Sequence, residues 1–136
     1  MELSDEQNAF LQKHSNQFLK MAFDYKRHEK VYQPDGYGKN TGDCGDTVEI
    51  SLTTKKKIIQ HVSLGIEGCI NTNACANAVA HFAEGRSVDE AWDITPEKII
   101  DFLETLDEDS HHCAELAVGS LYLALSDFKK KPVTRQ

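Results

Sequence analysis

The sequence predicts a single α+β domain over residues 1–136, in which a small antiparallel sheet, a hairpin of two to three strands, packs against four to five helices. Three observations support this fold class. The chain of 136 residues has the length of one compact domain. Its 40% hydrophobic and 27% charged residues are ordinary for a globular protein. Alternating apolar residues near the middle of the chain are flanked by stretches with helical spacing, without an internal repeat or a dividing linker.

Residues 1–32 predict one N-terminal helix. Ser4, followed by Gln7 three residues later, is typical of a capping box. Apolar side chains then recur with the helical period, and Pro34 disfavours helix in the residues just before it. The apolar face consists of Leu11, Phe18, Ala22 and Tyr25.

The next part of the chain predicts a loop and then a hairpin. Glycine and other turn-forming residues dominate residues 33–46, which we expect to be a loop. Apolar and polar residues alternate over residues 48–52, as in a half-buried strand. A second apolar run over residues 58–66 follows a short connection, so the two runs predict an antiparallel hairpin.

Small residues after Cys69 predict a helix capped by Asn71 or Thr72, and Gly85 is a suitable stop for it. Two more helices are expected where a capping residue precedes an apolar periodic stretch. The caps are Thr95, which is followed by Pro96, and Asp109 or Ser110.

Composition argues against several classes of function. The net charge is −7 and no basic stripe is present, so neither nucleic acid nor an anionic membrane is an expected partner. The N-terminus lacks a basic region followed by an apolar run, and no apolar stretch approaches the roughly 18 residues of a membrane span. We therefore expect a cytoplasmic protein, whose four cysteines are free, metal-bound or catalytic rather than disulfide-bonded.

Three cysteines stand at positions that suit a reactive site. Cys44 lies in a glycine-rich turn, Cys69 directly precedes a predicted helix, and Cys113 follows two histidines in the first turn of the last helix. The positive end of a helix dipole favours thiolate, which is the form that binds metal or carries sulfur. The alternative is that each cysteine is a small buried hydrophobic residue. Cys75, on the apolar face of its helix, fits that alternative best.

Several short stretches resemble the NifU/IscU-like scaffold family, of the NifU N-terminal domain type. They occur in the family's order, from about Phe18 to the end of the chain, with strand and helix patterns between them. Cys44-Gly45-Asp46 matches the Cys-Gly-Asp that precedes a strand in that family. The other matching stretches are residues 33–38, Gly68-Cys69, residues 85–91 and His112-Cys113.

The resemblance implies an iron–sulfur cluster assembly scaffold, a carrier rather than an enzyme. A cysteine desulfurase and an iron source would build a labile [2Fe-2S] cluster on it, and apo recipient proteins would receive the cluster. The protein as isolated could hold either zinc or iron. The implied site consists of the sulfur ligands Cys44, Cys69 and Cys113 with the auxiliary ligands Asp46 and His112. The resemblance is also compatible with a homodimer of the cluster-loaded protein.

The chain departs from the family in three respects that matter, and the additional cysteine Cys75 is one of them. Residues 106–110 replace the Leu-Pro-Pro-Val-Lys segment that an Hsp70-type chaperone grips, so recognition by such a chaperone is doubtful. Residues 38–44 are shorter than the corresponding segment of the family, which often contributes a strand.

Two other functions are compatible with the same residues. The first is a protein of the same fold that holds zinc and accepts sulfur from a desulfurase or regulates it. The second is a thiol redox enzyme that uses Cys113 with His112 and would need a second thiol nearby.

Overall fold

The sheet consists of three antiparallel strands in the order β1–β2–β3. The computed structural model describes residues 4–131. β1 (Gly36–Thr41) pairs with β2 (Thr47–Lys55), and β2 pairs in turn with β3 (Ile58–Glu67). The predicted hairpin of β2 and β3 is confirmed, and the sheet reaches the upper limit of the predicted two to three strands.

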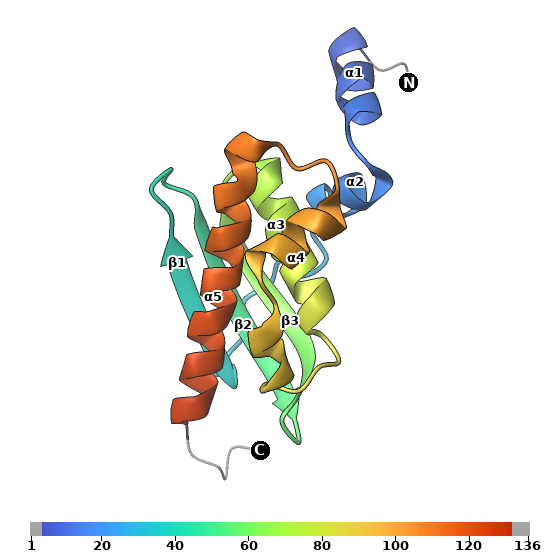
Figure 1. Ribbon diagram of the computed structural model, residues 1–136. Helices are drawn as coiled ribbons and strands as arrows, with labels where there is room; N and C mark the ends of the chain where they lie inside the picture. Colours follow the sequence, from blue (N-terminus) through green and yellow to red (C-terminus); the bar gives the residue numbers. More distant parts are fainter. Residues whose placement is uncertain (1–3, 132–136) are drawn as a thin grey trace.

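Helices cover one face of this sheet (Figure 1). α3 packs on β3, α5 packs on β1 and β2, and α4 packs outside α3 and α5. No helix within residues 4–131 is long and apolar enough to cross a membrane. The α-helices are α1 (Asp5–Lys13), α2 (Asn16–Ala22), α3 (Ile70–Ala83), α4 (Pro96–Leu103) and α5 (His111–Lys130), and short 3-10 turns form at Glu90–Asp93 and Glu108–Ser110.

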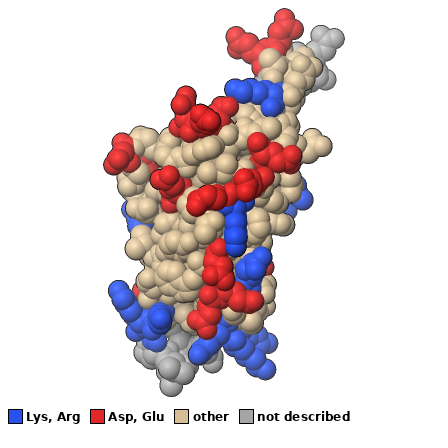
Figure 2. Space-filling view, viewed as in Figure 1, with Lys and Arg blue, Asp and Glu red and all other residues tan. Residues whose placement is uncertain are grey.

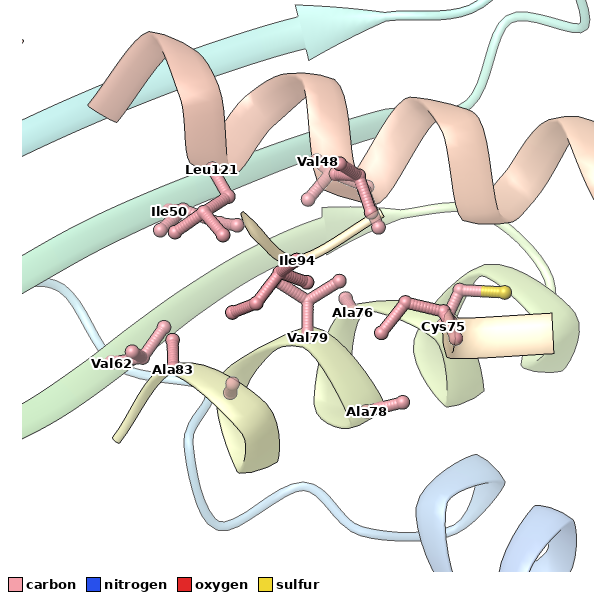
Figure 3. Close-up of a cluster of buried hydrophobic side chains, with 14 of the residues drawn as sticks. Val48, Ile50, Val62, Cys75, Ala76, Ala78, Val79, Ala83, Ile94 and Leu121 are labelled. Atoms are coloured by element: carbon pink, nitrogen blue, oxygen red, sulfur yellow. The ribbon is translucent and has the colours of Figure 1, made fainter. Parts of the chain in front are cut away.

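The core lies between the sheet and the two helices that pack on it. Figure 3 shows Val48 and Ile50 of β2 beside Leu121 of α5, with Val79 of α3 close by, and all four side chains are fully buried. α3 is rich in alanine on its buried face, which lets it lie close to its neighbours. The core therefore fixes how α3 and α5 lie on the sheet.

Glycine allows α5 to lie directly on β1. A Cβ at Gly36 or at Gly38 would come within 2.5 Å of a backbone atom of Ala124. Residues 33–46 were expected to be a loop, and that prediction is wrong for residues 36–41, which form β1. A glycine-rich segment has little intrinsic tendency to form a strand, but here the missing side chains make room for a helix.

The prediction of one N-terminal helix over residues 1–32 is also wrong. The capping box of Ser4 and Gln7 forms, but α1 ends at Lys13 and a second helix begins at Asn16. The break is stabilised by tertiary contacts, because the Ser15 hydroxyl donates to the Leu103 carbonyl at 2.8 Å and its amide donates to Thr105 at 2.8 Å. Residues 1–3 lie outside the described part of the chain.

The remaining predicted elements form with small differences at their ends. Thr95 caps α4 with Pro96 in its first turn, and Ser110 is the N-cap residue of α5. The cap of α3 is Cys69 itself rather than Asn71 or Thr72. This difference of two or three residues matters, because it places Thr72 inside the helix.

Candidate functional site

Three segments that are distant in the sequence meet at one end of the sheet, the upper end in Figure 1. The turn between β1 and β2 carries Cys44 and Asp46. Cys69 stands immediately before α3, and the first turn of α5 carries His112 and Cys113. All five residues predicted for the site therefore come from elements that converge on the same end of the molecule.

The turn between β1 and β2 has a defined shape. The Gly42 amide donates to the Asp46 carbonyl at 2.9 Å, and the Gly45 amide donates to the Gly42 carbonyl at 2.9 Å. Gly45 has φ +90°, a conformation that favours glycine. The turn leaves Cys44 exposed at its tip and brings the half-buried side chain of Asp46 toward the start of α3.

Asp46, Cys69 and Cys113 form a compact set of donor atoms. One carboxylate oxygen and the two sulfurs all lie within 4.8 Å of one another. Donors bonded to one tetrahedral metal ion at about 2.0 to 2.3 Å stand about 3.3 to 3.8 Å apart, so a small adjustment of the side chains would let these three share an ion. Two soft sulfur donors suit iron–sulfur clusters or zinc.

Cys44 and His112 lie beside this set rather than within it. His112 Nε2 is 3.6 Å from Cys113 Sγ, and both Cys44 and His112 line a surface hollow of about 530 Å³. The open side of the site is therefore also bordered by a thiol and an imidazole. The other residues that line the hollow are Asn40, Gly42, Asp43, Glu115 and Leu116.

Burial separates the three thiols. Cys44 and Cys69 are exposed, whereas Cys113 is only 1% exposed. Burial raises the pKa of Cys113 to about 11, so the metal-free protein carries it as a thiol at neutral pH. The expectation that its place at a helix start would favour thiolate is wrong for Cys113, because the cost of desolvation exceeds the effect of the helix end.

Cys75 lies outside this set of donor atoms. It is fully buried among the apolar side chains of the core, as Figure 3 shows, and burial raises the pKa of its thiol well above the usual value. The placement agrees with the expectation that Cys75 is a structural cysteine.

Two neighbours of Asp46 shape the site. The Thr72 hydroxyl donates to Asp46 Oδ2 at 2.6 Å, and a Cβ on Gly68 would lie 2.8 Å from the same carboxylate. Sequence reasoning considered Thr72 only as a helix cap and missed this contact. The available signal was its spacing, because residues three apart in a helix lie on one face and Thr72 follows Cys69 by three.

Acidic side chains gather at this end of the molecule on the face seen in Figure 2. Figure 2 shows Asp and Glu gathered toward the upper end of the view, while Lys and Arg are concentrated at the lower end. Asp43, Asp109 and Glu115 are exposed on the segments that form the site. A surface of this sign attracts cations from solution.

Comparison with known proteins gives a consistent result. Residues 25–135 match the family model described as the NifU-like N terminal domain. The iron–sulfur cluster assembly scaffold protein IscU 1 of Archaeoglobus fulgidus is 29% identical over 104 residues, which cover 75% of this chain and 67% of that protein. The scaffold protein IscU of Escherichia coli is 28% identical over 115 residues, which cover 79% of this chain and 89% of that protein.

A solved structure has the same fold. The N-terminal part of a nitrogen-fixing NifU-like protein from Brucella abortus superposes with a TM-score of 0.71 at 15% identity, and the match covers 87% of this chain and 95% of that one. This likeness confirms the predicted α+β architecture of a small antiparallel sheet packed against helices.

Proposed function

Because this chain belongs to the family of NifU-like N-terminal domains, we propose that it assembles a [2Fe-2S] cluster on Cys44, Cys69 and Cys113 and delivers it to apo recipient proteins. Asp46 and His112 serve as auxiliary ligands. The chain is an iron–sulfur cluster assembly scaffold, as its relatives are, and it is a carrier rather than an enzyme, so the interpretation as a thiol redox enzyme is dropped.

The observation that carries the proposal is the convergence of Asp46, Cys69 and Cys113 within 4.8 Å. Thiolates hold iron–sulfur clusters, and a carboxylate is a poorer match for iron in a sulfur-rich cluster than a thiolate is. A ligand set that mixes the two types binds the cluster less firmly than four cysteines would. Cys44 stands on an exposed turn beside an open hollow, which suits a cargo that must enter and leave.

The exposed thiols suggest how sulfur arrives. A cysteine desulfurase presents sulfur as a persulfide. The thiolate of Cys44 or Cys69 attacks the terminal sulfur, and the desulfurase cysteine leaves as a thiolate, so the transfer needs no oxidant. Cys113 is too deeply buried to be reached first. We therefore propose a cysteine desulfurase as a partner that docks at the acidic end of the molecule, where both exposed thiols lie.

The sequence also supports a domain organisation, a compartment and a set of partners for the scaffold. Residues 1–136 act as one scaffold domain in the cytoplasm, without nucleic acid or a membrane as a partner. An Hsp70-type chaperone does not grip residues 106–110 tightly, because the segment that such a chaperone recognises is absent.

A zinc protein of the same fold is the second candidate. One oxygen and two sulfur donors within 4.8 Å also suit a single zinc ion, with His112 or Cys44 as the fourth ligand. Such a protein would accept sulfur from a desulfurase or regulate it.

Anaerobic preparation with iron and a desulfurase separates the two candidates. The scaffold binds iron and sulfide in equal amounts and shows visible absorption and circular dichroism. The Cys113→Ser variant should lose both signals, while Cys75→Ser, a matched change outside the donor set, should keep them. A colourless parent protein with one zinc and no sulfide would overturn the cluster assignment in favour of the zinc protein.

A further inference from the structure

The hydroxyl of Thr72 lies among the donor atoms of the site. Its Oγ1 is 2.6 Å from Asp46 Oδ2, 3.4 Å from Cys113 Sγ and 3.7 Å from Cys69 Sγ. The residue is fully buried and is the third residue of α3. It therefore contacts all three members of the compact donor set from inside the protein.

A hydroxyl has one proton to donate, and the distances indicate where that proton goes. The 2.6 Å contact with Asp46 Oδ2 has the length of a charge-assisted hydrogen bond from a hydroxyl to a carboxylate. The same hydroxyl also points at Cys113 Sγ, as a longer and weaker donor contact of 3.4 Å, and in the 3.7 Å contact with Cys69 Sγ either atom can donate. Thr72 thus connects a carboxylate to the two sulfurs that lie nearest to it.

Gly68 restricts the position of the Asp46 carboxylate from another side. A Cβ at this position would lie 2.8 Å from both Cγ and Oδ2 of Asp46, so the carboxylate rests against the Gly68 backbone. The same carboxylate accepts the hydrogen bond from Thr72. These two contacts hold the Asp46 carboxylate beside Cys69 and Cys113, where one of its oxygens lies within 4.8 Å of both sulfurs.

We propose that Thr72 is the positioning residue of this site. It holds Asp46 beside Cys69 and Cys113 and thereby determines how firmly the site retains its cargo. The link to retention rests on the proposed function, whereas the effect on Asp46 is a property of the metal-free protein. Carboxylate ligands are commonly oriented by a hydrogen-bonded neighbour, and removing such a neighbour typically weakens metal binding by about 10- to 100-fold.

The test compares Thr72→Val, which keeps the branched shape but loses the hydroxyl, with Thr72→Ser, which keeps the hydroxyl. In the metal-free protein, NMR couplings report the rotamers of Asp46. We expect one rotamer in the parent and in Thr72→Ser, and averaging in Thr72→Val. Far-UV circular dichroism checks that each variant folds. Thr72→Ala supplies the same comparison if valine disturbs the start of α3.

Zinc alone, titrated against a chromophoric chelator, is the probe of retention. Thr72→Val should lose about 10- to 100-fold in zinc affinity and Thr72→Ser should regain most of it. In an Asp46→Ala background the change to valine should have almost no further effect, because Thr72 acts through Asp46.

Three results would overturn the proposal: a single Asp46 rotamer in Thr72→Val, unchanged zinc affinity in that variant, or the same loss in the Asp46→Ala background. Failure of the proposed function looks different. In that case the parent assembles no iron–sulfur cluster, yet Thr72→Val still releases Asp46 and still lowers zinc affinity.

Discussion

The change of Gly68 to alanine tests how closely the site is built around the Asp46 carboxylate. Within residues 4–131 the glycines with positive φ are Gly45 and Gly85. Gly68 is not one of them, so alanine can adopt its backbone conformation. The new Cβ would lie 2.8 Å from Cγ and Oδ2 of Asp46. Carbon atoms pack at about 3.5 Å or more, so the carboxylate must retreat by about 0.7 Å.

Asp46 has no room to retreat toward Thr72, because their hydrogen bond is already 2.6 Å long. We therefore expect the side chain to rotate away from Cys69 and Cys113. Zinc affinity should fall by about tenfold, which corresponds to about 1.4 kcal/mol. Folding stability should stay within about 1 kcal/mol of the parent, because alanine also restricts the unfolded chain.

Chelator competition measures the zinc affinity, and the decay of visible circular dichroism measures the lifetime of a reconstituted cluster. Gly65→Ala is the matched control, since its Cβ would lie 2.8 Å from a carboxylate oxygen of Glu49, a residue outside the donor set. A Gly68→Ala protein with parental zinc affinity would refute the reasoning. An equal loss in Gly65→Ala would refute it too, because the effect would then be unspecific.

Three other predictions concern cluster transfer, the ion pair of Glu84 and Arg27, and chaperone recognition. Asp46→Ala should slow cluster transfer to an apo-ferredoxin several-fold, while Cys75→Ser should transfer at nearly the parental rate. Visible circular dichroism follows the transfer from both variants. A parental rate for Asp46→Ala would contradict a role of Asp46 in cluster transfer. Burial alone would raise the pKa of Glu84, but hydrogen bonds and charge from Arg27 outweigh it and lower the pKa below its ordinary 4.5. The contribution of Glu84 to the free energy of unfolding is therefore present above its ordinary pKa of 4.5 and is lost as pH falls through the lower folded pKa. Glu84→Gln should lower the free energy of unfolding, measured with urea, by about 1 to 3 kcal/mol at pH 7 and by much less in acid below that folded pKa. Calorimetric titration with an Hsp70-type chaperone should show no micromolar binding centred on residues 106–110, and such binding would contradict the prediction.

Local patterns were sufficient for the elements whose stability is mainly local. The alternation over residues 48–52 and the apolar run over residues 58–66 predicted β2 and β3, because a half-buried strand needs that pattern. Thr95 and Pro96 predicted the start of α4, because a cap and a proline in the first turn act on their own backbone.

Two elements depended on contacts that no local pattern contains. The helix predicted over residues 1–32 breaks near Ser15, because the serine bonds to residues about ninety positions away. β1 forms on a glycine-rich segment, because α5 needs the space that Gly36 and Gly38 leave. Long-range contacts of this kind override propensity, so a window of neighbouring residues could not predict them.

The sequence by itself determined the chemistry available at the site, because that chemistry depends on the residue types. These are thiols, a carboxylate and an imidazole, and their glycine-rich or helix-start settings suit a soft metal or a cluster. Only the tertiary structure decided which of these groups meet. It brought Asp46, Cys69 and Cys113 within 4.8 Å of one another, left Cys44 at the open edge, and buried Cys113 so that its pKa rises. It also placed the Thr72 hydroxyl among them. Distances and burial depend on how α3, α5 and the β1–β2 turn pack against each other, and packing is a property of the whole chain.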